Sequence, residues 1–354
     1  MSRFFSQKYA GLVPYTPGEQ PKERKYIKLN TNESPFPPSA AALKMASEAL
    51  TTLQLYSDPE CKQLVQAAAD YYRVGKDEIL FTNGSDEILD FAFMAFCDES
   101  TPAVFPDITY GFYSVFAELH HVPYEQLPLR EDFTIRVEDY LDVQKTVFLA
   151  NPNAQTGVAL SRDEIERIVK SNPKHVVVVD EAYVDFGAES CVPLIHQYDN
   201  LLVTQTFSKS RSLAGARLGF GIGSAALIRD LNTIKYSTNP YNVNSLTMAA
   251  GIGALQDDGY RAKNCAAVMK TRAETAAALR ELGFLLTDSS SNFLLARHPG
   301  ISGKILYQKL RERGILVRHF DTPRLCEYNR ITIGSEGQMK ALLAAVREIL
   351  EEDV

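Results

Sequence analysis

A lysine lies between two serines at the end of an apolar stretch, in the sequence Ser208-Lys209-Ser210. The stretch before it, residues 201–207, is apolar enough to form a buried strand, so Lys209 would stand just beyond the strand end. Most lysines are solvated surface charges. A lysine amine held in a cavity can instead form a Schiff base with a carbonyl group, or carry a proton as an acid or a base.

An acidic residue follows four consecutive valines in the segment 176–183. An unpaired carboxylate at the end of a buried strand is costly, so Asp180 needs a cation or a hydrogen-bond donor. Two interpretations remain open at this point: Asp180 caps the next helix, or it serves as a catalytic partner. Tyr183, considered alone, is more typical of packing than of chemistry.

A turn of Gly84, Ser85 and Asp86 precedes an apolar helix that we predict for residues 88–96. Free amides and the positive end of a helix dipole favour an anion such as phosphate. Taken alone, such a turn is far more often simply the start of a helix. Arg217 follows Lys209 through a glycine-containing loop and adds a guanidinium group, which binds phosphate well.

Together these side chains match the requirements of pyridoxal phosphate. That cofactor needs a lysine for a Schiff base, an acid for its pyridine nitrogen, and hydroxyl, amide and guanidinium donors for its phosphate. Lys209, Asp180 and the Ser85 and Arg217 donors supply these parts. The combination, and no single residue, predicts the cofactor.

Polar clusters follow five predicted strands, and an open α/β sheet would bring them together. From residue 39 to 277, short apolar runs alternate with helical patterns, which is typical of an α/β domain with a mostly parallel central sheet flanked by helices. Ligands bind outside the carboxyl ends of such strands. We therefore expect one site formed by residues 83–86, 107–110, 151–157, 180–183 and 208–210.

Three segments are predicted along the chain. Residues 1–38 contain six prolines and little periodicity, so we expect an extended N-terminal arm, associated with the small domain. Residues 39–277 form the large cofactor-binding domain. Residues 278–354 predict a smaller α+β domain, with short strands, one helix near 302–313 and a C-terminal helix with one apolar face. Two capping boxes, Ser57 to Glu60 and Ser161 to Glu164, predict helix starts.

The composition is that of an ordinary globular chain, with 354 residues, 45% hydrophobic and 23% charged. The net charge of -7 and the scattered basic residues argue against nucleic acid as a partner. No signal-peptide pattern and no apolar run of about 18 residues is present, so we expect neither secretion nor a membrane span. The five cysteines are far apart and odd in number, which predicts no metal site, no disulfide framework and a cytoplasmic location.

Five motifs occur in the order found in a known family. The segment Thr206 to Phe220, with the sequence TFSKSRSLAGARLGF, resembles the cofactor-lysine segment of fold-type-I aminotransferases. The whole set resembles the histidinol-phosphate aminotransferases in particular and spans nearly the whole chain. The other four motifs are Asn30 to Pro35 (NTNESP), Asn83 to Glu87 (NGSDE), Val179 to Tyr183 (VDEAY) and Asn329 to Gly334 (NRITIG).

The resemblance implies a role for each cofactor contact. Lys209 would form the Schiff base with pyridoxal phosphate and then move the substrate proton. Asp180 would keep the pyridine nitrogen protonated, and Tyr183 would donate a hydrogen bond to the 3-oxygen of the ring. Tyr110 would stack on the ring. The phosphate contacts implied are Gly84, Ser85, Asp86, Ser208 and Arg217.

Two further positions matter because the chain departs from the family pattern near them. Tyr56 is similar to a family tyrosine that reaches the phosphate of a neighbouring subunit, which implies a homodimer, although Ser57 replaces the usual proline. The family sequence Asn-Asn-Pro-Thr-Gly reads Asn153-Ala-Gln-Thr-Gly157 here. Ala154 thus takes the place of an asparagine that contacts the 3-oxygen, and Asn153 is the candidate to replace it.

Four residues are candidates for substrate binding. Arg330 and Arg318 lie at the edges of predicted small-domain strands, and a guanidinium fork suits a carboxylate or a phosphate. Without the resemblance they could equally be surface arginines. Tyr15 and Asn32 resemble substrate-side residues of the N-terminal arm.

The resemblance implies transamination of histidinol phosphate with 2-oxoglutarate, giving imidazole acetol phosphate and glutamate in histidine biosynthesis. An aromatic amino acid aminotransferase or a threonine-phosphate decarboxylase of the same fold would share the cofactor motifs. A non-catalytic pyridoxal-phosphate sensor fused to a DNA-binding module is a remote alternative. The sequence argues against it, because about 30 residues before Asn30 are too few for a helix-turn-helix domain and linker, and the charge is acidic.

Overall fold

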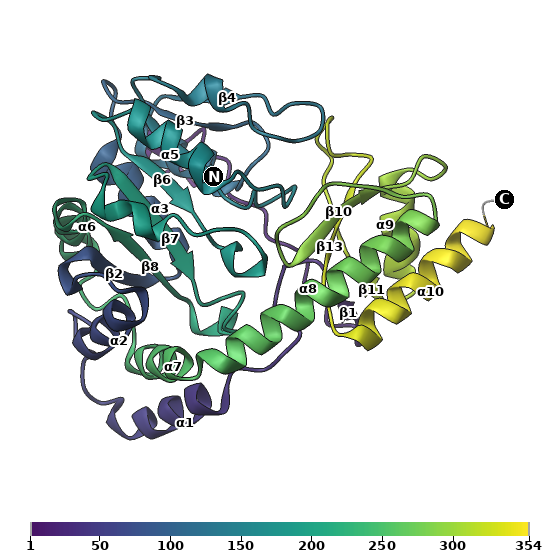
Figure 1. Ribbon diagram of the computed structural model, residues 1–354, viewed down its shortest axis with the longest axis horizontal. Coiled ribbons are helices and arrows are strands. Elements are labelled where there is room, and N and C mark those ends of the chain that lie inside the picture. The colour runs from purple at the N-terminus through teal and green to yellow at the C-terminus, as the bar shows by residue number, and fades with distance from the viewer. Residues whose placement is uncertain (1, 353–354) are drawn as a thin grey trace.

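The computed structural model describes residues 2–352, and a seven-stranded sheet forms the centre of its larger part (Figure 1). Residues 1, 353 and 354, at the ends of the predicted arm and small domain, lie outside the described residues. The strand order is β2-β8-β7-β6-β5-β3-β4. The strands are β2 (Ile79–Asn83), β3 (Ala103–Pro106), β4 (Tyr124–Leu127), β5 (Thr146–Ala150), β6 (Val177–Asp180), β7 (Leu201–Thr206) and β8 (Leu218–Gly223).

This sheet is mostly parallel, because only β8 runs antiparallel to its two neighbours, β2 and β7. Its central strands are almost continuously apolar, since both faces are covered by helices. Alternate residues enter two different cores: Phe148 and Val178 belong to one, Val147 and Val179 to the other. The covering helices are α2 (Lys62–Tyr72), α3 (Ser85–Phe96), α4 (Phe112–His120), α5 (Arg162–Ser171), α6 (Ala225–Thr238) and α7 (Ser245–Gln256).

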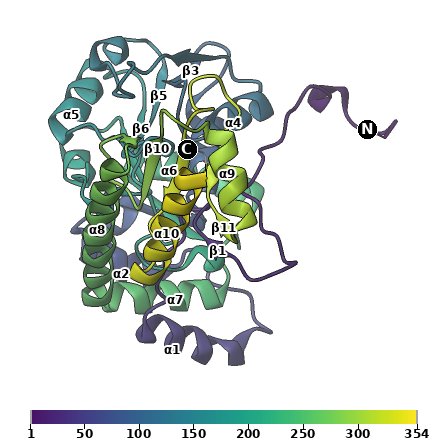
Figure 2. The same cartoon turned by 90° about the vertical axis from the view of Figure 1, so that its right-hand side faces the viewer.

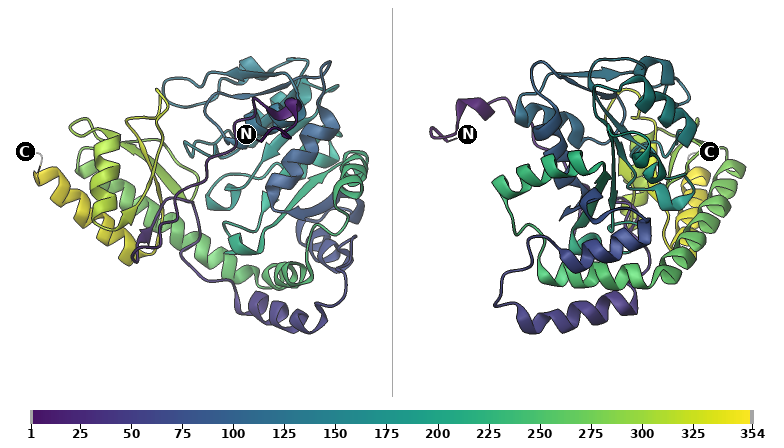
Figure 3. Two further views of the ribbon diagram at one scale, coloured as in Figure 1. Left: turned by 180° about the vertical axis from the view of Figure 1, so that it is seen from behind. Right: turned by 60° about the vertical axis from the view of Figure 1, so that its left-hand side comes forward.

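Helix α1 (Ala40–Ala49) packs along α7, as Figure 3 shows, and a second, smaller sheet lies at the other end of the molecule. That sheet is antiparallel, in the order β12-β13-β10-β9. Helix α8 (Asp258–Glu281) runs between the two parts of the molecule. The remaining elements there are β9 (Leu285–Leu286), β10 (Phe293–Arg297), α9 (Gly303–Glu312), β12 (Arg318–His319), β13 (Asn329–Thr332) and α10 (Glu336–Glu352).

The N-terminal segment runs along the outside of the molecule and its first residues project away from it (Figure 2). Strand β1 (Ile27–Lys28) pairs in parallel with β11 (Ile315–Leu316). Arg24 donates to the carbonyl groups of Arg311 and Glu312. These contacts support our proposal that the arm associates with the small domain. The proposed boundary between residues 277 and 278 lies inside α8, near its end.

The two predicted capping boxes have different outcomes. Ser161 forms the expected box with Glu164 at the start of α5, which is confirmed. The box from Ser57 to Glu60 is wrong: α2 begins at Lys62, and the Asp58 carboxylate accepts hydrogen bonds from backbone amides there. The Ser57 hydroxyl donates to the Val243 carbonyl instead, because a charged carboxylate one residue later is the stronger acceptor for these amides.

The α/β fold class, with a large mostly parallel sheet and a smaller antiparallel one, is therefore confirmed. None of the helices within residues 2–352 has the length and apolarity needed to cross a bilayer. Within the same residues, no group of three or more histidine, cysteine or acidic side chains is arranged to hold a metal ion.

Candidate active site

A cavity of about 390 Å³ lies at the carboxyl ends of β5, β6 and β7. Each of the five polar clusters contributes to its wall. The predicted site residues that line it are Ser85, Asp86, Tyr110, Asp180, Tyr183, Ser208, Lys209 and Arg217. A cavity of about 640 Å³ near Lys235 is larger, but its lining contains no arginine and no serine, and its acid, Glu60, is exposed and paired with Lys62.

Lys209 stands in the loop that follows β7, and its side chain reaches the cavity half-buried. Its Nζ donates to the Thr31 carbonyl at 3.3 Å and lies 5.7 Å above the ring of Tyr183. The loop is closed by a backbone hydrogen bond from the Leu213 amide to the Phe207 carbonyl. Lys209 therefore has a neutral carbonyl as its hydrogen-bond partner, and its charge helps to lower the pKa of Glu33 in the same cavity.

Asp180 is the last residue of β6 and is buried. Its carboxylate accepts a hydrogen bond from the Tyr113 hydroxyl at 3.3 Å and one from the Ala182 amide at 3.2 Å. It does not cap a helix, because the short helix η5 (Val184–Phe186) follows Tyr183 without a side-chain cap. Burial raises the pKa of Asp180 to about 7, and no described residue forms an ion pair with it. A cationic ligand atom would supply that partner.

Tyr113 is a site residue that the sequence reasoning missed. It lies on α4, three residues after Tyr110, which precedes the helix, and it is buried. A signal was available, since a turn brings residues three apart close together. The Tyr113 amide donates to the Tyr110 carbonyl at 3.2 Å, which returns position 113 to the polar cluster that contains Tyr110.

Helix α3 begins at Ser85, which lines the cavity. Its first amides have no partner within the helix, as at every helix start. Asp86 accepts hydrogen bonds from Tyr110 at 2.6 Å and from the Arg217 Nη2 atom at 2.8 Å. Gly84 has a φ of +83°, and a Cβ atom there would lie 2.5 Å from Arg217 Nη2. Only glycine lets this guanidinium group lie against the turn. The result is an anion-binding corner with Ser85 and Ser208 hydroxyl groups beside it.

Asn32 and Tyr183 form a buried pair. The Asn32 Nδ2 atom donates to the Tyr183 hydroxyl at 2.9 Å, and the Asn32 amide donates to Thr332 on β13 at 2.9 Å. Asn32 is 1% exposed and has a φ of +55°. In this structure Asn32 thus orients Tyr183 and joins the arm to both parts of the molecule.

Asn153 is not among the cavity-lining residues, although we predicted a cofactor contact. Its Oδ1 accepts hydrogen bonds from the amides of Gln155 and Thr156, and its Nδ2 donates to the Ile108 carbonyl at 2.8 Å. Both ends of the amide therefore hold the loop after β5. Ala154 lines the cavity instead and presents only a methyl group.

Arg330 is half-buried close to the cavity, and no described carboxylate pairs with its charge. Its Nη1 donates to the Ala154 carbonyl at 2.8 Å and to the Gln155 Oε1 at 3.1 Å, while its Nε has no partner among the described residues. The guanidinium lies over the rings of Phe293 and Phe320. A half-buried arginine that keeps free donors is suited to a carboxylate or phosphate ligand.

The other two substrate candidates lie farther out. Arg318 donates to the carbonyls of Thr16 and Pro17, so it holds the arm. Tyr15 stacks on Phe112 at 4.3 Å, and its ring centroid is 6.4 Å from that of Tyr110. Burial raises the pKa of the Tyr15 phenol, while the positive charges of Arg330 and Arg318 oppose the rise.

Tyr56 is not brought to the cavity of its own chain. Its side chain is 85% exposed and stacks on Tyr241 at 4.7 Å. The neighbouring side chains of Leu53 and Leu55 are exposed as well.

These residues fit pyridoxal phosphate. The buried Asp180 carboxylate lacks a cation that a protonated pyridine nitrogen would provide. The α3 start, the Ser208 hydroxyl and the Arg217 guanidinium form a corner for a phosphate, and Gly84 leaves the space that a Cβ would fill. Lys209 supplies an amine in the same cavity.

Comparison with known proteins places the chain in a family. The family model for aminotransferase class I and II matches residues 24–346. A histidinol-phosphate aminotransferase of Brachyspira hyodysenteriae is 46% identical over 353 residues, which cover 99% of this chain and 100% of that protein. A histidinol-phosphate aminotransferase 2 of Dechloromonas aromatica is 48% identical over 354 residues, with 99% of each chain covered.

Among solved structures, the histidinol-phosphate aminotransferase of Sinorhizobium meliloti, in complex with pyridoxal 5'-phosphate, has the same fold. Its TM-score is 0.91 and its sequence identity 22%, with 100% of this chain and 99% of that chain covered. The chain therefore belongs to the class I and II aminotransferases, a family of pyridoxal-phosphate enzymes, and the two relatives named above, which it matches over their full length, are histidinol-phosphate aminotransferases.

Proposed function

We propose that this enzyme transfers the amino group of histidinol phosphate to 2-oxoglutarate, giving imidazole acetol phosphate and glutamate in histidine biosynthesis. The relatives' names support the substrate. The observation that carries the chemistry is the single cavity that combines Lys209, the buried Asp180 and an anion-binding corner. Pyridoxal phosphate, when bound, supplies an electron sink for the carbanion that forms at the substrate carbon.

The chain's own residues then have separate tasks. Lys209 would hold the cofactor through Nζ and would move the substrate proton as base and then acid. Asp180, oriented by the Tyr113 hydroxyl, would keep a proton on the pyridine nitrogen. Tyr183, oriented by Asn32, would donate to the ring oxygen. Tyr110 would cover the ring.

Arg330 is the proposed anchor for the anionic end of each substrate. Histidinol phosphate has a phosphate group and 2-oxoglutarate has carboxylate groups. The guanidinium group can donate hydrogen bonds to either kind of anion. Its partial burial strengthens the attraction, because a charge removed from water interacts more strongly with an opposite charge. Gln155 and the Ala154 carbonyl hold the guanidinium in place.

We also propose a homodimer in which Tyr56 reaches the phosphate corner of the partner. The 85% exposure of Tyr56, its absence from its own chain's cavity lining and the exposed leucines beside it support an intermolecular contact. We propose the cytoplasm as the compartment, since the five cysteines are free thiols, which a reducing compartment maintains.

A substrate comparison tests the function. Purified enzyme with pyridoxal phosphate and 2-oxoglutarate is assayed for glutamate formation with histidinol phosphate or phenylalanine, and for carbon dioxide release from threonine phosphate. We expect the highest kcat/KM with histidinol phosphate. No turnover of histidinol phosphate, with turnover of another donor, would refute the proposed substrate and leave the family assignment intact.

Cofactor attachment is tested separately. Wild-type protein is expected to show the absorbance band of a covalently bound cofactor, and Lys209→Ala is expected to lose it, because no other lysine lines the cavity among the described residues. A wild type that binds no cofactor would refute the attachment.

A further inference from the structure

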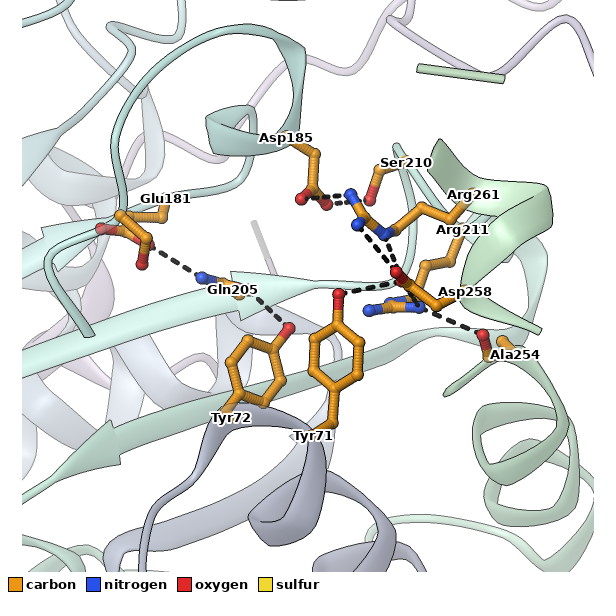
Figure 4. Close-up of polar contacts among 11 residues, drawn as sticks. Tyr71, Tyr72, Glu181, Asp185, Gln205, Ser210, Arg211, Ala254, Asp258 and Arg261 are labelled. Atoms are coloured by element: carbon orange, nitrogen blue, oxygen red, sulfur yellow. Dashed lines mark hydrogen bonds and ion pairs between the residues drawn. The ribbon is translucent and has the colours of Figure 1, made fainter. Parts of the chain in front are cut away.

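The two residues that follow Lys209 are held by a polar network beneath the loop (Figure 4). The Ser210 hydroxyl donates to the Asp185 carboxylate. Arg211 is buried, and its Nη1 donates to the Ala254 carbonyl at 3.1 Å and lies 3.5 Å from Asp258. Neither side chain is among the cavity-lining residues, although the preceding residues Ser208 and Lys209 are.

Arg261 joins the two acids of this network. It donates to Asp185 at 2.8 Å through Nη1, and to Asp258 through Nε at 2.6 Å and Nη2 at 3.1 Å. The Tyr71 hydroxyl adds a further bond to Asp258 at 2.9 Å. Burial acts to raise the pKa of Asp258, but the hydrogen bonds from Arg261 and Tyr71 outweigh it and keep this pKa below its usual value. Asp258 and Arg261 are therefore an ion pair at neutral pH.

Asp185 belongs to the segment that carries the other cofactor residues. It lies in η5, two residues after Tyr183 and five after Asp180. Helix α8 holds η5 at two points: Arg261 contacts Asp185, and the Arg272 side chain donates to the Phe186 carbonyl at 2.9 Å. The segments that follow β6 and β7 therefore both contact residues of helix α8, directly or through Asp185.

A charged cluster at this depth is a weak source of stability, because desolvation offsets most of its attraction. The side chains of Arg261 and Asp185 are 17% and 30% exposed. What such a pair does supply is fixed geometry, and here the geometry it fixes is the spacing between the Lys209 loop and the segment with Asp180 and Tyr183.

We propose that the Asp185–Arg261 pair is a positioning device for Lys209, acting through the Ser210 hydroxyl. The inference rests on the proposed role of Lys209 in proton transfer, where a small displacement of the amine slows the reaction strongly. Neither Asp185 nor Arg261 is among the residues that line the cavity, so their effect reaches the amine only through the loop.

The test compares Asp185→Asn, Ser210→Ala and Ser210→Thr with a control, Arg313→Gln. The control removes an arginine ion pair with Glu352 that is partly buried and joins the end of α9 to α10, away from the cavity. The first readout is hydrogen exchange of the 207–213 amides in cofactor-free protein. The second is kcat and KM for histidinol phosphate.

We expect Asp185→Asn and Ser210→Ala each to speed exchange in the loop severalfold and to lower kcat about tenfold, with KM changed by less than about twofold. Ser210→Thr, which keeps a hydroxyl, should retain most of the wild-type kcat. The effect of Asp185→Asn should largely disappear in a Ser210→Ala background, because both remove one link. Arg313→Gln should change neither readout.

Unchanged loop exchange in both variants, or independent effects that simply add, would overturn the proposal. A poorly folded Asp185→Asn does not prevent the test, since Ser210→Ala removes only one hydroxyl group. The exchange readout needs no substrate and no cofactor. If the enzyme does not turn over histidinol phosphate, the proposed function is refuted. The hydrogen-exchange result still decides whether the Asp185–Arg261 pair positions the loop.

Discussion

Asp180 is an acidic residue in a buried position, and in the cofactor-free protein it has no positively charged partner among the described residues. Its place at the end of a buried strand excludes water, and its partners within the chain are one tyrosine hydroxyl and one amide. Burial therefore raises its pKa to about 7. The same carboxylate is well suited to a cationic nitrogen, so its unfavourable surroundings are the reason it can bind one strongly.

A stability measurement follows from this pKa. In the unfolded chain Asp180 releases its proton near its ordinary pKa of 3.8, whereas the folded cofactor-free protein keeps that proton up to about pH 7. The stability that protonated Asp180 contributes is thus present below the unfolded pKa and is lost as the pH rises through the folded value. Asp180→Asn stays neutral throughout and avoids this loss.

We therefore expect cofactor-free Asp180→Asn to be more stable than wild type by a few kcal/mol at about pH 8, since one pKa unit is worth about 1.4 kcal/mol. The advantage should vanish at about pH 4. Urea unfolding of both proteins across this range measures it, and the Glu181 carboxyl, whose pKa burial also raises to about 7, is common to both. If the free energies of unfolding of the two proteins differed by the same amount at every pH, the proposed effect of burial on Asp180 would be contradicted.

Arg330 makes a prediction about substrate affinity. Arg330→Lys keeps the positive charge but loses the guanidinium fork, so KM should rise at least about tenfold for both histidinol phosphate and 2-oxoglutarate. Gln155→Ala removes one acceptor that holds the fork and should raise both KM values by a smaller factor, about threefold. Steady-state kinetics measures both. A rise for only one substrate would show that the two anions use different sites.

At the scale of elements, the turn from β2 into α3 determines how the anion-binding corner is built. Gly84 has a positive φ and sits against the Arg217 guanidinium. Asp86, in the first turn of α3, then fixes both Arg217 and Tyr110. One helix start thereby arranges a phosphate site and the ring that would cover the cofactor.

Gly84→Ala tests this arrangement. A methyl group would lie 2.5 Å from Arg217 Nη2, and the backbone at φ +83° and ψ 163° would cost a non-glycine residue about 1–3 kcal/mol. We expect the affinity for pyridoxal phosphate, measured by fluorescence titration, to fall about tenfold or more. Gly337→Ala on α10 is the matched control, because its Cβ would meet nothing within 4 Å. Equal affinities in the two variants would count against the corner.

At the scale of the whole molecule, Tyr56 has no role in the cavity of its own chain and gains one only in the proposed dimer. The structure places it on the surface, stacked on Tyr241, while its proposed ligand lies in a cavity of another copy. An active site shared between subunits predicts that two defective chains can repair one another.

Mixing Lys209→Ala chains with Tyr56→Ala chains tests this. A mixed dimer contains one site with both Lys209 and Tyr56 intact, so dissociation and reassociation should restore activity that neither variant has alone. A mixture of Lys209→Ala with Asp180→Asn is the control, because both residues lie in the same chain's cavity and every mixed site stays defective. Restoration in the control mixture, or none in the first, would refute the shared site.

Much of the fold could be predicted because its signals are local. Valine runs identify buried parallel strands, and residues at the carboxyl ends of such strands meet at one edge of a sheet. The strand pattern alone therefore places Lys209, Asp180 and Ser85 in one site. The Ser161 capping box is local in the same way, since both partners lie within one helical turn. The Ser57 box failed because a competing acceptor was one residue away.

Contacts between distant segments were decided by the tertiary structure alone. Asn32 lies 151 residues from Tyr183, Arg330 lies 176 from the Ala154 carbonyl, and Arg261 lies 76 from Asp185. No spacing rule links such pairs, because each forms only after separate elements pack together. The sequence by itself determined which chemical groups stand at the strand ends. Packing decided which partners orient them, since hydrogen bonds depend on distances of a few ångströms that only the folded chain sets.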